Sequence, residues 1–140
     1  MKLEVYDLKE PVFHSAVTLV VNCTFEQCQK WLKKYSDEDL KECERFANGV
    51  GLHLPIKNKD GQNCHVIWLK KFEWTIYDMS VLVHELVHLV TSLLDQKQVP
   101  IGLENDETMA YLLEYYTYES FHKLKVHSKN YKRKLKRKKK

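Results

Sequence analysis

Residues 81–94, with the sequence VLVHELVHLVTSLL, constrain the fold more than any other segment of this chain. Valine and leucine fill most positions and lie on nearly every side of a helix, so this segment is expected to form a long, mostly buried helix. Two histidines and a glutamate interrupt the apolar run. Burying such groups costs free energy unless something compensates them. The segment therefore predicts a central helix and also a partner for its three polar side chains.

The three polar residues, His84, Glu85 and His88, form an HExxH motif. Residues four apart share one face of a helix, so both imidazoles can reach one Zn²⁺, while Glu85 lies about 100° further round and can address a water on that metal. The composition alone gives roughly three chances in a hundred of one such pentad, so the bare motif is only suggestive. The apolar surroundings favour metal binding over two core histidines satisfied by tyrosine or carboxylate partners.

A catalytic zinc ion usually takes three protein ligands and water, so a third ligand is expected downstream. Glu107 is the first candidate, because a helix returning antiparallel after a short loop brings its first turns near the metal-bearing helix. Glu104 and Asp106 are alternatives, and Glu107 could also be only a favourable carboxylate at a helix N-terminus. Glu114 could hydrogen-bond a ligating histidine. Tyr111 could donate to an oxyanion, although aromatic residues at helical spacing are more often core.

The remaining residues that can bind metals are not grouped in the sequence. His14, His53 and His65 are isolated on predicted strands or loops, which is typical of surface or hydrogen-bonded residues. The four cysteines show no CxxC spacing and are expected to be reduced thiols, which indicates a cytoplasmic protein. The N-terminal residues lack the apolar stretch of a signal peptide, and no window is long enough for a membrane span.

The chain as a whole predicts an α+β fold in which a small mixed sheet with a hairpin packs on helices. The HExxH helix and the antiparallel helix that follows it are expected to form the site. The predicted elements are a strand at 15–22, helices at 24–35 and 36–48, a hairpin at 50–70, the HExxH helix from about 78 to 98, and a last helix from 105.

The net charge of +4 hides a sharp division of the chain. Residues 1–119 hold all 19 acidic residues and 12 basic ones, a balance of −7, while 120–140 hold 11 basic residues and no acid. One domain is therefore predicted at 1–127, with a disordered basic tail at 128–140. The tail could be a solvated extension, could bind a membrane surface, or could bind nucleic acid phosphates without base specificity. The candidates for nucleic acid contacts are Lys132, Arg133, Lys134, Lys136 and Arg137.

The HELVH helix, followed by a loop and then Glu107 in ETMAYL, resembles the gluzincin group of zinc metallopeptidases in its smallest form. It is similar in particular to small phage-encoded HExxH proteins, which would place the chain in a host cytoplasm. The resemblance covers residues 64–118. It implies that His84, His88 and Glu107 bind zinc, that Glu85 is the general base, and that the strand at 65–69 lies beside the site, where an extended substrate could pair with it.

The first hypothesis from the sequence is thus a zinc metallopeptidase that hydrolyses a peptide bond. A second is a non-catalytic zinc-stabilised module that binds a nucleic acid or a phage assembly through the basic tail. A third is a protease acting on DNA-bound proteins, as in the SprT-like family. A fourth protein ligand that closed the coordination sphere would favour the structural role, whereas a position left open for water would favour catalysis.

Overall fold

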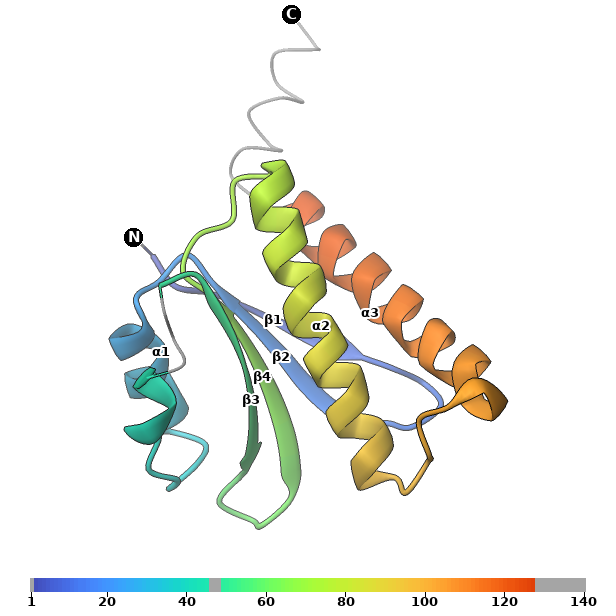
Figure 1. Ribbon diagram of the computed structural model, residues 1–140. Helices are drawn as coiled ribbons and strands as arrows, with labels where there is room; N and C mark the ends of the chain where they lie inside the picture. Colours follow the sequence, from blue (N-terminus) through green and yellow to red (C-terminus); the bar gives the residue numbers. More distant parts are fainter. Residues whose placement is uncertain (1, 46–48, 128–140) are drawn as a thin grey trace, which may run out of the picture.

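A four-stranded mixed sheet forms the centre of the computed structural model, which describes residues 2–45 and 49–127 (Figure 1). Three helices pack against this sheet, which confirms the predicted α+β fold. The elements in chain order are β1 (Glu4–Lys9), β2 (Ala16–Val21), α1 (Phe25–Leu32), a 3-10 helix (Glu42–Arg45), β3 (Gly51–Lys57), β4 (Asn63–Leu69), α2 (Ile76–Gln96), a second 3-10 helix (Leu103–Asn105) and α3 (Asp106–His127).

The order of the strands in the sheet is β1-β2-β4-β3. The pairs β1/β2 and β3/β4 are antiparallel, while β2 and β4 run parallel with Leu19 opposite Ile67. The predicted hairpin at 50–70 is therefore confirmed as β3 and β4. Within this hairpin His53 lies opposite Ile67, and Pro55 lies opposite His65. Among the described strands, β1 and β3 form the two edges of the sheet.

Both faces of the two inner strands are buried, because helices cover the sheet on each side. Ile67 and Leu69 of β4 belong to the hydrophobic core that α2 and α3 share with the sheet. The alternate residues, Val66 and Trp68, belong to the second core, beneath α1. This period of two is the geometry of a pleated strand, and it explains why β4 is apolar at nearly every position.

The helices α2 and α3 run antiparallel on one face of the sheet (Figure 1). α2 packs on β3 and β4, and α3 packs on β1. α2 begins slightly earlier than predicted, because the N-cap is Thr75, whose hydroxyl accepts a hydrogen bond from the backbone of Asp78. In the part of the chain that the structure describes, no helix is both long and apolar enough to cross a membrane.

Two expectations about the N-terminal half differ from the structure. Strand β1 was not predicted, because three of the six residues of its sequence EVYDLK are charged types that are depleted in strands. The helix expected at 36–48 is reduced, over its described residues, to the 3-10 helix at 42–45, and 46–48 lie outside the described residues. The capping box of Thr24 and Gln27, by contrast, opens α1 as expected.

Candidate metal site

The two histidines of the HExxH motif point their ring nitrogens at each other on α2. The Nε2 atoms of His84 and His88 are 3.2 Å apart, and the ring planes are inclined at 76°. Two nitrogens bound at about 2.0–2.1 Å to one tetrahedral zinc ion are about 3.3 Å apart. The spacing between the two imidazoles therefore matches that of two nitrogens on one zinc ion, and in the metal-free protein it is also the length of a hydrogen bond between the rings.

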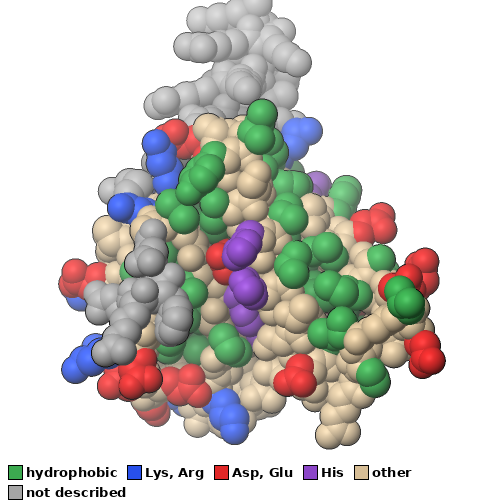
Figure 2. Space-filling view, viewed as in Figure 1, with side chains coloured by type: hydrophobic (Ala, Val, Ile, Leu, Met, Phe, Trp, Pro, Cys, Tyr) green, Lys and Arg blue, Asp and Glu red, His purple; other side chains and the backbone are tan. Residues whose placement is uncertain are grey.

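The expectation that all three polar residues are buried is wrong for the histidines. His84 and His88 are exposed, whereas only 7% of the Glu85 surface is accessible. Figure 2 shows the histidine side chains at the surface over α2. The helix buries one apolar stripe against the sheet and α3, and the histidines lie on the opposite side. The stripe consists of Leu82, Leu86, Leu89, Val90, Leu93 and Leu94.

An open pocket of about 620 Å³ joins the motif to the edge strand β3. Glu85 lies in this pocket beside both histidines, so the structure brings the three residues of the motif together. The wall facing them is formed by the first five residues of β3, 51–55, with Cys43 and Ser92 completing the lining. No residue of α3 lines the pocket. The expectation that the last two helices form the site is therefore wrong, because the motif faces away from α3.

Gly51 allows β3 to approach α2 closely at this pocket. A Cβ atom at this position would lie 2.8 Å from Cγ1 of Val81 and 3.0 Å from Cδ2 of Leu69. Both distances are shorter than ordinary contacts between carbon atoms, so any larger residue would push the strand and the helix apart. The glycine therefore sets the distance between the edge strand and the motif.

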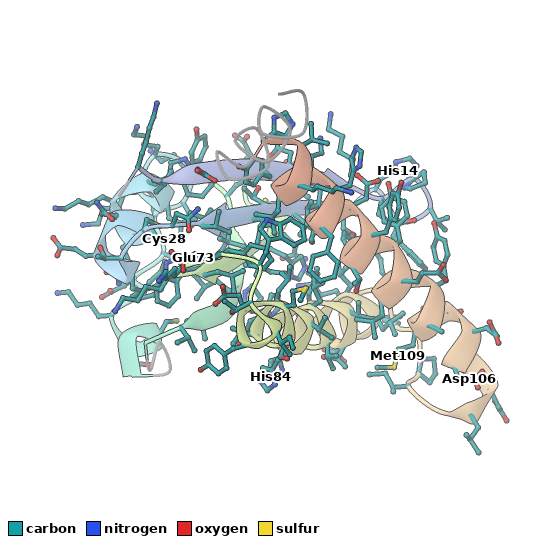
Figure 3. The ribbon with its side chains drawn as sticks, turned by 90° about the horizontal axis from the view of Figure 1, so that it is seen from above. His14, Cys28, Glu73, His84, Asp106 and Met109 are labelled. Atoms are coloured by element: carbon teal, nitrogen blue, oxygen red, sulfur yellow. The ribbon has the colours of Figure 1, made fainter. Side chains whose placement is uncertain are left out.

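The acidic residues expected to supply a third ligand lie elsewhere. Glu104 is exposed in the second 3-10 helix, and Asp106 and Glu107 are exposed at the start of α3. Figure 3 shows His84 extending from the side of α2 that faces away from α3, well separated from Asp106. Across the described residues, no three His, Cys, Asp or Glu side chains are grouped so that they could hold a metal ion. The structure therefore does not bring Glu107 to the histidine pair.

The other candidates on α3 also have positions outside the pocket. Glu114 is exposed and does not line the pocket, so it is not a partner of either histidine there. Tyr111 donates a hydrogen bond of 2.9 Å to Glu10, which is far from the motif in sequence and belongs to the connection between β1 and β2. The strand implied beside the site, 65–69, is the inner strand β4, and both of its edges are already paired. The strand that lies beside the motif is instead the neighbouring edge strand β3.

A histidine pair that the sequence analysis treated as isolated lies beside the motif. Nε2 of His53 is 3.0 Å from Nδ1 of His65, and Nε2 of His65 is 2.9 Å from Oε1 of Gln96. His53 lines the pocket together with His84 and His88, while His65 is 1% exposed. Only the register of the hairpin brings the two rings together, since it puts both on the face of the sheet toward α2. The positions of the two histidines on opposite arms of the predicted hairpin are the one sequence signal that could have suggested this.

Burial disfavours the charged form of both of these histidines. Burial, followed by repulsion from the neighbouring His65 and His88, lowers the pKa of His53 from 6.5 to about 3. Burial also lowers the pKa of His65, although the hydrogen bond to Gln96 opposes that change. A lowered histidine pKa means that the folded state resists protonation more than the unfolded state does.

The stability of the metal-free protein is expected to fall as the pH falls below about 6.5. The unfolded chain then takes up protons at His53 and His65 that the folded chain refuses, so unfolding becomes easier, by up to about 1.4 kcal/mol per pH unit for each histidine. Urea denaturation at pH 7, 6 and 5 measures this slope. His53→Gln should reduce it, whereas His122→Gln, which changes an exposed histidine on α3, should not. Equal slopes in both variants would contradict the assignment.

The residues of the basic tail, including Lys132, Arg133, Lys134, Lys136 and Arg137, lie outside the described residues. The nucleic acid contacts and the disorder expected there thus remain expectations from the sequence. Comparison of this chain with protein-family models, with curated proteins and with solved structures finds no match.

Proposed function

We propose that this chain is a zinc-dependent hydrolase of peptide bonds, in which His84 and His88 bind the metal and Glu85 is the general base. The observation that carries the proposal is the Nε2–Nε2 distance of 3.2 Å between the two histidines, beside a buried carboxylate in the same pocket. The other pocket of similar size, about 630 Å³ beside α1, contains no histidine or cysteine in its lining.

The imidazoles of His84 and His88 are suited to occupy two of the coordination positions of a zinc ion. Imidazole nitrogen is a preferred zinc ligand, and the two nitrogens have the separation that one tetrahedral ion requires. The exposure of His84 and His88 supports an entry path for the metal and leaves room for water. A zinc ion bound there would polarise a scissile carbonyl and lower the pKa of a bound water.

Glu85 has the surroundings of a general base. Its side chain is buried, it opens into the pocket, and no described residue forms a hydrogen bond with its carboxylate. Both carboxylate oxygens are therefore free to accept a proton from a water molecule held in the pocket. The same group can then deliver that proton to the leaving amine.

The edge of β3 at residues 51–55 supports a peptide as the substrate, whereas Lys57 at the far end of the strand already forms hydrogen bonds with Ser36 and Glu38. This strand pairs with β4 alone among the described strands, and its residues 51–55 form the wall of the pocket opposite the motif. An extended chain that added to this edge by main-chain hydrogen bonds would run past Glu85 and the histidine pair. Pro55 lacks an N–H, so pairing would weaken toward that end of the strand.

Elemental analysis of protein purified without added zinc tests the metal centre. One equivalent of zinc is expected in the wild type, and almost none in His84→Ala or His88→Ala, because each substitution removes one of two closely spaced ligands. His122→Ala, an exposed histidine on α3, is the matched control and should keep its zinc. A wild type without any bound divalent metal would refute the proposed function.

A further inference from the structure

Three side chains in contact with one another extend from the pocket to the end of α2. His53 on β3 contacts His65 on β4 at 3.0 Å, and His65 contacts Gln96, the last residue of α2, at 2.9 Å. The two imidazole rings are nearly parallel, with planes inclined at 10°. No role in the proposed hydrolysis has so far been assigned to these residues.

Gln96, the last of these three residues, determines which ring nitrogens of His53 and His65 carry a hydrogen. Oε1 of Gln96 can only accept, so Nε2 of His65 must carry the hydrogen and its Nδ1 must be the acceptor. Nε2 of His53 then donates to that Nδ1. In a neutral ring only one nitrogen is protonated, so Nδ1 of His53 keeps an unshared electron pair.

His53 lies in the pocket that contains the proposed metal ligands. The exposed imidazoles of His84 and His88 line this pocket as well. A histidine that binds a metal typically donates its other N–H to a fixed partner, which sets its tautomer. His53 has such a partner in His65, while Glu107 lies outside the pocket.

We propose that His53 is the third protein ligand of the metal held by His84 and His88. This inference rests on the proposed function, because it requires the metal. The three imidazoles are not yet gathered as a metal site, so binding must draw His53 toward the pair. Metal sites are rarely complete before the ion binds, and the binding free energy can drive such an adjustment.

Competition with a chromophoric zinc chelator gives the zinc affinity of each variant. His53→Ala and His53→Gln should both bind zinc more than about 100-fold more weakly, because the loss of an outer partner alone already costs about 10–100-fold. Gln96→Leu, which removes the acceptor of His65 and leaves His65 itself beside His53, should weaken binding by no more than about 10-fold. Glu107→Ala should bind zinc like the wild type.

Nitrogen NMR of protein labelled in its histidines provides a second measurement that needs no activity. The metal-free protein should show His53 protonated at Nε2, and zinc should shift the Nδ1 resonance of the same ring. Zinc loss in Glu107→Ala together with normal affinity in both His53 variants would overturn the inference, and so would an Nδ1 resonance that zinc leaves unchanged. If the wild type binds zinc and His84→Ala does not, such results refute the role of His53 alone and leave the proposed function standing.

Discussion

Replacing Glu85 with glutamine is expected to lower turnover by about 10²–10⁴-fold and to leave the stability of the metal-free protein nearly unchanged. The carboxylate oxygens of Glu85 are not among the buried polar atoms without a partner in the described part of the chain, so water in the pocket can solvate a carboxylate or an amide there. Glu85 is 7% exposed, and no described residue forms a hydrogen bond with it. The substitution therefore removes the proposed base without removing a contact that holds the fold together. Removal of a general base lowers turnover by about 10²–10⁴-fold.

Urea denaturation, zinc content and cleavage of a mixed peptide library measure the three consequences of Glu85→Gln. Zinc content should be unchanged, because Glu85 is not among the proposed ligands. Glu114→Gln is the matched control, since it makes the same chemical change at an exposed position on α3 and should alter none of the three. A less stable Glu85→Gln variant would show that the carboxylate is satisfied in the folded protein. Unchanged turnover would remove Glu85 from the mechanism.

The sequence predicted the centre of the site because its geometry is local. His84, Glu85 and His88 lie within two turns of one helix, and helical periodicity alone sets their relative directions. The side of the helix that is exposed was not predicted correctly. With apolar residues on nearly every side of α2, the sequence did not show that the sheet and α3 cover the stripe opposite the histidines.

The distance between Glu107 and the histidine pair depends on the length of α2. The number of residues between them in the sequence does not reveal that length. α2 continues for eight residues beyond His88, to Gln96. At a rise of 1.5 Å per residue, the chain is about 12 Å past the histidine before it turns. Glu107, the second residue of α3, therefore begins the return far from His88, and α3 lies on the other side of α2.

The role of His53 depends on strand register, which sequence patterns specify poorly. A shift of one residue in the pairing of β3 with β4 would place His53 on the opposite face of the sheet. The observed register, with Pro55 opposite His65, puts His53 and His65 diagonally across the hairpin on the face toward α2. The hairpin itself was predicted, but this contact between its arms was not.

Glu10→Ala is expected to destabilise the protein by about 3 kcal/mol, because it removes the centre of a buried hydrogen-bond network. The Glu10 side chain is 1% exposed. Its carboxylate accepts hydrogen bonds from the backbone N–H groups of Val12 and Phe13, at 2.7 and 2.6 Å, and from the hydroxyl of Tyr111. It thus fixes the connection between β1 and β2 and ties that connection to α3.

A double-mutant cycle with Glu10→Gln and Tyr111→Phe measures the tie between the loop and the helix. Tyr111→Phe alone should cost about 1 kcal/mol, and the two substitutions together should cost less than the sum of their separate effects, because they remove the same hydrogen bond. Tyr118→Phe, an exposed tyrosine on the same helix, should change stability little. Zinc content should be normal in all of these variants, since neither Glu10 nor Tyr111 lines the pocket. Loss of zinc in Tyr111→Phe would instead return this hydroxyl to the site and contradict a purely structural role.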